Sequence, residues 1–415
     1  MRQGVKAGCI ALAAATIALC AGCQNAPTNL KEAYADYFPI GVALGYESYD
    51  YYSDEIYANF SSVTCENSMK WESLEGKEGT FTYMAADEIV EFAKSKDMLV
   101  RGHTILWHRQ APSWIFVEEN DAGEQVTASI ATLKERITDY VENVVGHFKD
   151  DVYAWDVVNE VLSDFGYFYR DCEDTNTSEN YSDWYRCVRE EVVREICEET
   201  GETYYPAIGN DAMKNEEGYR PLTSEERAQV DDAFTDLLAF LFKEVKRVDP
   251  DCKLFYNDYN LTIPARRNAC IEMLKRLEAK GAQIDGVGEQ GHYSIYEYNG
   301  ELLEQAIKTY TEAGYLFQIT ELDISMYSSG DYRPNSATEP TQEQLDLQTQ
   351  TYADIFRILR EYSDMVDCVT LWGVADDHTW LDNWPVANRK NWPLLFDVYG
   401  EPKDCYYAIL NFEEE

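Results

Sequence analysis

The chain has 415 residues, 45% of them hydrophobic, which is enough to bury a large core and excludes a largely disordered protein. Its 35 lysine and arginine residues stand against 76 aspartate and glutamate residues, so the formal net charge is −41. Such a charge repels phosphate backbones and anionic lipid headgroups, and we therefore expect no nucleic-acid partner. The 9 tryptophans and 31 tyrosines instead offer flat apolar faces of the kind on which sugar rings stack.

The amino terminus has the features of an export signal. A charged start precedes the apolar run Cys9–Leu19, which is typical of a secretory signal and too short to span a membrane. The run ends in Cys20-Ala-Gly-Cys23, which is similar to a bacterial lipoprotein box except that Cys20 stands where that motif prefers leucine. We expect a signal peptide over residues 1–23 and a lipid anchor on Cys23, at the bacterial outer membrane or cell surface. Without lipidation, the mature protein is expected to be secreted or periplasmic.

The remaining cysteines give no sign of a metal site. None of them forms a close Cys-x-x-Cys pair, so a zinc site is not predicted, and we expect neither a metal nor another cofactor. Cys172, Cys187 and Cys197 lie in one segment and are candidates for a disulfide after export. Three others lie in apolar, strand-like runs and are interpreted as buried thiols, namely Cys65, Cys252 and Cys368.

Eight short apolar runs alternate with longer helical patterns along the chain. Apolar residues recur every three or four positions over residues 133–144 and 234–245, which predicts two amphipathic helices. The pair Asp249-Pro250 ends the second of them. Eight strands with intervening helices are typical of a closed parallel (β/α)8 barrel, the TIM barrel. The apolar runs are residues 38–44, 62–65, 98–102, 152–158, 253–256, 284–287, 316–319 and 368–372.

Polar or aromatic side chains stand at the end of seven of these eight runs. In (β/α)8 enzymes the active site is built at the carboxyl ends of the strands, so these side chains are expected to converge on one site. They are Glu66 with Asn67, His103, Asn159 with Glu160, Asn257 with Asp258, Gln290 with His292, Glu321 with Asp323, and Trp372.

One catalytic domain is expected over residues 33–415, joined to the leader by a tether over residues 24–32. The stretch 163–229, rich in tyrosine and acidic residues, interrupts the alternation and is interpreted as an insertion after the fourth strand. Its role in packing, substrate contact or partner binding is left open by the sequence. The chain shows no internal repeat and no linker rich in proline and serine, so a second domain is not predicted, and a monomer is expected.

Seven sequence blocks occur in the order found in glycoside hydrolase family 10, the endo-β-1,4-xylanases (EC 3.2.1.8). The chain resembles this family from Phe38 to Ile409. The resemblance implies a (β/α)8 barrel, hydrolysis with retention of configuration, and xylan and xylo-oligosaccharides as substrates. The insertion is longer than in compact members, and Trp380 lies in a modified context. The blocks are Glu66–Trp71, His103–Gln110, Trp155–Glu160, Asn257–Asn260, Asp285–His292, Ile319–Asp323 and residues 371–374.

Two glutamates are expected to carry out the chemistry. A retaining glycosidase uses one carboxyl group as acid and base and the other as nucleophile, about 5–5.5 Å apart. Glu160 ends the fourth strand and is assigned as the acid/base, and Glu321 follows the seventh and is assigned as the nucleophile. At that separation, the charge of Glu321 is expected to raise the pKa of Glu160 and keep it protonated.

Three further residues are expected to support this pair. Asp323 points the same way as Glu321 in an extended chain, and the resemblance implies that His292 bridges the two. Asn159 faces away from Glu160 in an ideal strand, so a change of direction at the strand end is needed for it to reach a sugar 2-OH.

The resemblance also implies a set of sugar-binding residues. Gln290 is expected to contact the 2-OH or Glu321, and Asn257 and Asp258 are expected to support the site from behind. Trp372 and Trp380 are expected to form the floor and wall around the cleaved unit. The positions that match the non-reducing side of the cut are Glu66, Asn67, Lys70, His103, Trp107 and Gln110.

Two other functions remain open from the sequence. A pocket wide enough for a hydroxymethyl group would accept β-1,4-glucan in place of xylan. A sugar-binding protein of a surface glycan system would suit the lipid anchor and the aromatic residues, but it would not need both glutamates.

Overall fold

The computed structural model describes residues 26–164, 168–171, 181–202, 222–334 and 337–412. The predicted signal peptide and the anchor on Cys23 lie outside these residues. Among the described helices, none is both long enough and apolar enough to cross a membrane.

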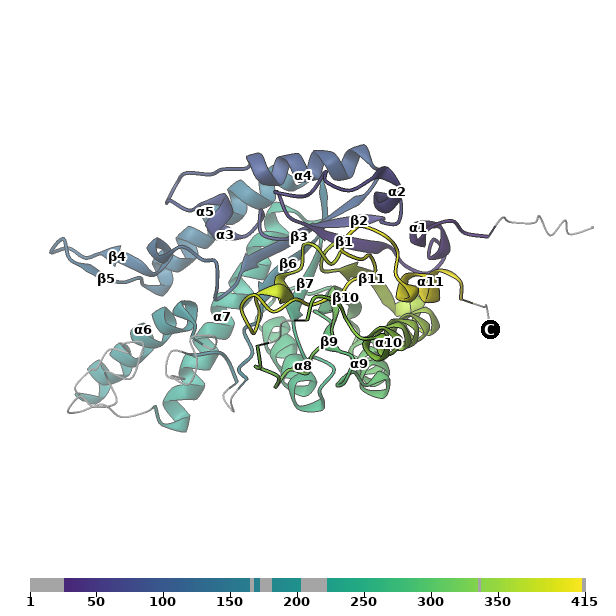
Figure 1. Cartoon of the computed structure of the whole chain (residues 1–415). Helices are drawn as coiled ribbons and strands as arrows, with labels where there is room; N and C mark the ends of the chain where they lie inside the picture. The colour runs from purple at the N-terminus through teal and green to yellow at the C-terminus, as the bar shows by residue number, and fades with distance from the viewer. Residues whose placement is uncertain (1–25, 165–167, 172–180, 203–221, 335–336, 413–415) are drawn as a thin grey trace, which may run out of the picture.

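In the described part of the chain, eight parallel strands close into a barrel, as predicted (Figure 1). The strand order is β11-β1-β2-β3-β6-β7-β8-β10, and pairing of β10 with β11 closes the ring. A short strand, β9 (His292–Ser294), adds to the end of β10. The barrel strands are β1 (Ile40–Leu44), β2 (Ser62–Cys65), β3 (Leu99–Leu106), β6 (Val152–Asn159), β7 (Lys253–Asp258), β8 (Gly286–Glu289), β10 (Leu316–Ser325) and β11 (Val366–Leu371).

Several strands are longer than the apolar runs predicted. His103, Asn257 and Glu321 lie within their strands because the backbone ladder continues to the barrel mouth after the run of apolar residues ends. A polar side chain is tolerated there because its own face of the strand opens into the mouth rather than into the core.

Helices surround the barrel and include the two that the periodicity predicts. These are α5 (Ile130–Phe148) and α7 (Ser224–Val248), and α7 ends directly before Asp249. A capping box at Thr223 fixes the start of α7. The others are α1 (Leu30–Ala33), α2 (Asp54–Tyr57), α3 (Trp71–Leu74), α4 (Met84–Ser95), α6 (Asp183–Thr200), α8 (Pro264–Ala279), α9 (Gly300–Glu312), α10 (Gln342–Glu361) and α11 (Asp404–Leu410).

The segment predicted as an insertion contributes helix α6. Together with the antiparallel hairpin of β4 (Val117–Glu119) and β5 (Gln125–Thr127), it projects from one end of the barrel (Figure 1). The Thr127 hydroxyl donates to Glu190 of α6 at 2.8 Å. This hydrogen bond joins α6 to the β4–β5 hairpin, which belongs to the segment that follows β3.

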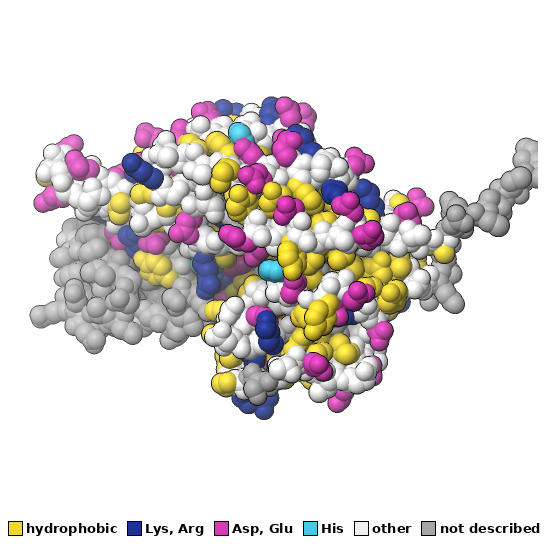
Figure 2. Space-filling view, turned by 45° about the horizontal axis from the view of Figure 1, so that its top comes forward, with side chains coloured by type: hydrophobic (Ala, Val, Ile, Leu, Met, Phe, Trp, Pro, Cys, Tyr) yellow, Lys and Arg dark blue, Asp and Glu magenta, His cyan; other side chains and the backbone are white. Residues whose placement is uncertain are grey.

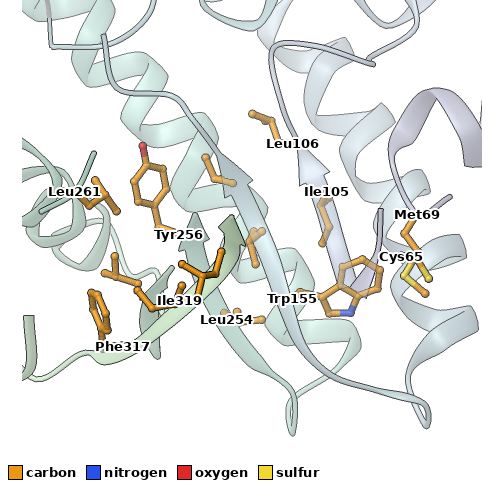
Figure 3. Packing of buried hydrophobic residues seen from close by; sticks show 14 of the residues in the cluster. Cys65, Met69, Ile105, Leu106, Trp155, Leu254, Tyr256, Leu261, Phe317 and Ile319 are labelled. Carbon is orange, nitrogen blue, oxygen red and sulfur yellow. The ribbon is translucent and has the colours of Figure 1, made fainter. Parts of the chain in front are cut away.

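The core lies both inside the barrel and between the barrel and its helices. Trp155 of β6, Leu254 of β7, and Phe317 and Ile319 of β10 are among the buried side chains of the barrel strands (Figure 3). Gly102 is required on β3 because a Cβ there would lie 2.2 Å from the Trp155 ring. These contacts hold the strands in the register that brings their carboxyl ends together.

Two expectations about the periphery need correction. Cys187 and Cys197 are both free, buried thiols, so they do not pair with each other; Cys172 lies outside the described residues. Cys187 and Cys197 are ten residues apart along α6, and the helix holds them at different turns. The fold also begins before residue 33: Leu30 is buried, and its N–H donates to Asn59 at 3.0 Å. That part of the expected tether is therefore packed against the barrel.

Candidate active site

A cleft of about 900 Å³ opens at the carboxyl ends of the barrel strands. Acidic side chains are scattered over the face of the molecule in Figure 2, with fewer basic ones between them. Gln110 and Asp323 do not line the cleft, but each accepts a hydrogen bond from a residue that does, Lys70 and Trp380 respectively. The other sequence-predicted residues line the cleft, namely Glu66, Asn67, Lys70, His103, Trp107, Asn159, Glu160, Gln290, His292, Glu321, Trp372 and Trp380.

Glu160 follows the end of β6 with a left-handed backbone, φ 54°. Consecutive side chains of an extended strand point to opposite faces, and a left-handed residue breaks that alternation. As a result, the Asn159 amide donates to Glu160 Oε1 at 3.3 Å. The positive φ of Glu160 is thus the change of direction that brings both side chains into the cleft.

Two asparagines connect Glu160 to Glu321. The Asn257 amide nitrogen lies 2.7 Å from Glu321 Oε1 and 2.9 Å from Asn159 Oδ1. The Thr320 hydroxyl donates to Asn257 Oδ1 and fixes which end of the amide points toward the carboxylate. Asn257 therefore contacts the predicted nucleophile directly, whereas Asp258 faces away and pairs with Arg266 at 2.8 Å.

The carboxylate of Glu160 accepts further hydrogen bonds from Trp107 Nε1 at 2.9 Å and from Gln290 Nε2 at 2.8 Å. Gln290 thus contacts Glu160, a partner that was not among the two alternatives left open by the sequence, the sugar 2-OH and Glu321. Burial alone would raise the pKa of Glu160, but the positive charges of His108 and Arg170, together with these hydrogen bonds, lower it to about 2.

The low pKa of Glu160 corrects the expectation that the charge of Glu321 keeps Glu160 protonated in the free protein. His108 and Arg170 come from loops whose approach to Glu160 the sequence does not reveal, and their positive charges lower the pKa of Glu160.

His292 lies between Glu321 and Asp323. Its Nε2 lies 3.3 Å from Glu321 Oε2 and its Nδ1 lies 3.0 Å from Asp323 Oδ2. Burial alone would lower the pKa of His292, but the charge of Asp323 and the hydrogen bonds to both carboxylates raise it to about 10. Trp380 Nε1 donates to the same Asp323 oxygen at 2.8 Å and packs edge-on against the His292 ring. A cationic His292 therefore places a positive charge and a hydrogen-bond donor beside the Glu321 carboxylate.

A second polar cluster occupies the other side of the cleft. Lys70 Nζ donates to Asn67 Oδ1 and to Gln110 Oε1, both at 2.9 Å, and lies 4.7 Å from the centre of the Trp107 ring. Burial lowers the pKa of Lys70, although the charges of Glu321, Glu66 and Glu160 oppose this effect. The cluster joins hydrogen-bonding groups to an aromatic ring, an arrangement that suits a polyol.

His103 and Trp372 also line the cleft. The His103 ring packs edge-on against Trp372 and its Nδ1 lies 2.8 Å from Asp156. Asp156 is also paired with the fully buried Arg101 inside the barrel. His103 is therefore held from the core side while one edge faces the cleft.

The cleft continues past Glu160 along a side that the sequence analysis did not assign. Tyr259 and Asn260 belong to the Asn257–Asn260 block that resembles family 10. Their membership in this block is the sequence feature that could have identified them as cleft residues. Arg170 lacked any comparable signal, because it lies within the predicted insertion. The further lining residues on this side are Thr262, Ile263, Tyr293, Ser294, Glu297, Tyr298 and Asn299.

The arrangement places two carboxylates of unlike environment in one open cleft. Glu321 faces a cationic histidine and an amide donor, and Glu160 faces Trp107 and Gln290. Such a pair can divide nucleophilic and proton-transfer roles between its members. Over the described residues, no three His, Cys, Asp or Glu side chains form a group that could hold a metal ion.

Similarity to known proteins covers nearly the whole chain. The profile of Glycosyl hydrolase family 10 matches residues 29–198 and 203–412. The Beta-1,4-xylanase of Dictyoglomus thermophilum is 37% identical over 384 residues, covering 92% of this chain and 91% of that protein. The Endo-1,4-beta-xylanase A of Caldicellulosiruptor saccharolyticus is 35% identical over 396 residues, covering 95% of this chain and 98% of that protein.

The structural comparison agrees with the sequence comparison. The crystal structure of xylanase XynB from Paenibacillus barcinonensis, complexed with a conduramine derivative, superimposes with a TM-score of 0.74 at 35% identity. The match covers 92% of this chain and 98% of that one. With the closed barrel and the strand-end carboxylates already described, the chain belongs to glycosyl hydrolase family 10.

Proposed function

We propose that this protein is an endo-1,4-β-xylanase that hydrolyses internal β-1,4 bonds of xylan with retention of configuration. The observation that carries the proposal is the pair of Glu160 and Glu321 in one cleft, connected through Asn159 and Asn257. Xylanase relatives that match the chain over nearly its full length support the substrate class.

In the first step, Glu321 attacks the anomeric carbon and forms a covalent glycosyl ester, while Glu160 protonates the departing oxygen. His292 and Asn257 direct hydrogen-bonding groups at Glu321 and orient its carboxylate for the attack. In the second step, Glu160 removes a proton from water, which hydrolyses the ester with a second inversion.

Glu160 must take up a proton before the first step, because its pKa is low in the free protein. A sugar in the cleft excludes water around Glu160 and offers hydroxyl groups as alternative partners for Gln290 and Trp107. Both changes raise the pKa of a buried carboxyl group. The same low pKa suits the second step, in which Glu160 acts as a base.

The shape of the cleft supports internal cleavage. Glu66, Asn67 and Lys70 line it on one side of the glutamate pair, and Tyr259 and Asn260 line it on the other. Sugar units can therefore bind on both sides of the cut. Trp107 and Trp380 also line the cleft. We propose that these two rings leave too little room for a hydroxymethyl group on the bound sugar.

Aryl xylobioside and aryl cellobioside with the same leaving group distinguish xylan from glucan as the substrate. We expect kcat/KM to be higher on the xyloside by at least about tenfold, the scale on which one small group changes pocket selectivity. Preference for the cellobioside would overturn the xylan assignment. No cleavage of either compound by folded protein would instead favour a sugar-binding role.

We further propose that the protein is exported and anchored through Cys23, a proposal that rests on the sequence alone. Expression in a bacterium, followed by detergent partitioning and fatty-acid labelling, tests it. Wild type is expected to enter the detergent phase and a Cys23→Ser variant to remain in the aqueous phase. Wild type in the aqueous phase would contradict lipidation.

A further inference from the structure

The backbone of Glu160 is held at both of its polar groups. Its N–H donates to the carbonyl oxygen of Asn257 at 2.9 Å, and its carbonyl oxygen accepts from Arg170 Nε at 2.6 Å. Glu160 has a φ of 54°, which is unfavourable for a residue with a Cβ and is kept only where the surroundings hold it. Arg170 is one of the two groups that hold it.

Arg170 reaches Glu160 from the segment that returns after β6. Its own N–H donates to Val161 O at 2.8 Å, beside a bridge between Leu162 and Tyr169. The side chain is almost fully buried, with 2% exposed, and its guanidinium also lies 3.2 Å from Asp164. A planar, permanently charged fork can contact several oxygens at once, which a lysine cannot reproduce.

The same guanidinium contacts Tyr259, which directly follows β7 on the same side of the cleft. Arg170 donates to the Tyr259 hydroxyl and lies 5.6 Å from the centre of its ring. Arg266 lies 4.5 Å from the centre of that ring, and the Tyr259 hydroxyl donates to Asp164 at 2.6 Å. Tyr259 is thus fixed between two arginines and lines the cleft beyond Glu160.

We infer that Arg170 is a positioning residue that holds the Glu160 peptide and the Tyr259 ring as one rigid unit on the leaving-group side of the cleft. In this unit the Glu160 carboxyl group faces the glycosidic oxygen while Tyr259 carries the departing sugar. The start of the segment predicted as an insertion therefore supports catalysis through the two residues that it positions. This role rests on the acid/base function proposed for Glu160.

The charge of Arg170 acts on the same carboxyl group. Five charged groups surround Glu160. They are Lys70 from the loop after β2, His108 after β3, Arg170, Asp258 at the end of β7, and Glu321 of β10. Removing Arg170 takes one positive charge from this set and leaves the negative charges of Asp258 and Glu321. Loss of the guanidinium is therefore expected to make Glu160 easier to protonate.

Three purified full-length variants separate positioning from charge and from packing. Arg170→Met removes both the contacts and the charge, and Arg170→Lys retains the charge without the fork. Arg266→Met is the matched control, because Arg266 contacts Asp164 and Tyr259 but makes no hydrogen bond to Glu160 in the described residues. Each variant is assayed on xylopentaose and on dinitrophenyl xylobioside, whose leaving group needs no proton, across a range of pH, with Tm as a check on folding.

We expect Arg170→Met to lower kcat/KM on xylopentaose by at least about tenfold and on the dinitrophenyl substrate by less than about threefold. Its basic limb of kcat/KM is expected to move up by about one pH unit. Arg170→Lys is expected to lose more kcat/KM on xylopentaose than on the dinitrophenyl substrate, without a shift of the basic limb. Arg266→Met is expected to leave the basic limb of kcat/KM at the wild-type pH.

Equal losses on both substrates in folded Arg170→Met and Arg170→Lys would overturn the inference, as would an unmoved limb in Arg170→Met or the same shift in Arg266→Met. If Arg170→Met does not fold, the lysine variant alone decides through its ratio of losses. Failure of the wild type to cleave xylopentaose would overturn the proposed function together with the inference.

Discussion

The amide nitrogen of Asn257 lies 2.7 Å from Glu321 Oε1, and the same nitrogen lies 2.9 Å from Asn159 Oδ1. Asn159 in turn donates to Glu160, so one chain of amides spans the two carboxylates. The separation and orientation of the pair therefore depend on the side chain of a third residue at the end of β7.

Replacing Asn257 with alanine removes the central member of this chain. The variant is expected to remain folded and to lose about 10- to 100-fold in kcat, because a hydrogen bond to a charged group is worth about 1.5–3 kcal/mol. Steady-state kinetics on xylopentaose, with Tm as a control, measure the effect. Unchanged kcat would show that the amide chain does not position the carboxylates.

The pH dependence of the reaction reports the protonation of Glu160. The basic limb of kcat/KM reflects the free enzyme, in which the pKa of Glu160 is low, whereas the limb of kcat reflects the complex. We therefore expect the limb of kcat to lie at higher pH. Gln290→Leu removes one donor to Glu160 and is expected to bring the two limbs closer. Coincident limbs in the wild type would contradict proton uptake on binding.

His292 links stability to alkaline pH. Its pKa is raised from 6.5 to about 10, so folding favours its proton. The stabilisation is complete below the unfolded pKa and is lost as pH rises through about 10. The difference in Tm between wild type and His292→Asn should accordingly shrink between pH 6 and about pH 11. A difference that does not change with pH would show that the ion pairs of His292 contribute nothing.

Glu289, a buried carboxyl group, also makes the stability of the fold depend on pH. Burial raises its pKa from 4.5 to about 7, and its carboxylate accepts from Leu261 N at 2.6 Å. A raised pKa means that the contribution is present below 4.5 and is lost as pH rises through about 7. Glu289→Gln removes this titration, so the variant should gain up to about 3 kcal/mol relative to wild type between pH 5 and pH 8.

Urea unfolding at the two pH values measures the effect for Glu289. Glu312→Gln, an exposed glutamate at the end of α9, serves as the control and should show no such change. An equal free-energy difference at both pH values for Glu289→Gln would contradict the assigned role of burial.

The barrel and most of the cleft follow from local patterns in the sequence. Strands buried on both faces appear as short apolar runs, and the polar residues that follow them converge because parallel strands end on one side. Glu321 and Asp323 are two residues apart at the extended end of β10 and share a face, since both contact the His292 ring. These relationships depend on near neighbours, which the sequence displays.

The remaining features depend on residues far apart in the chain. The left-handed φ of Glu160, the approach of Arg170 and His108, and the choice of Glu160 as the partner of Gln290 all arise from how loops meet. The expected direction of the Glu160 pKa shift was wrong for this reason, since positive charges and hydrogen bonds brought by tertiary contacts lower this pKa.

The anomeric configuration of the first products tests the central claim most directly. Time-resolved NMR of xylopentaose hydrolysis follows wild type, Glu160→Ala and Glu321→Ala under the same conditions. We predict β-configured products first from wild type, with each variant slower by at least about 10³-fold. Products that are α-configured at the start, or a Glu321→Ala variant of near wild-type rate, would contradict a retaining mechanism with Glu321 as its nucleophile.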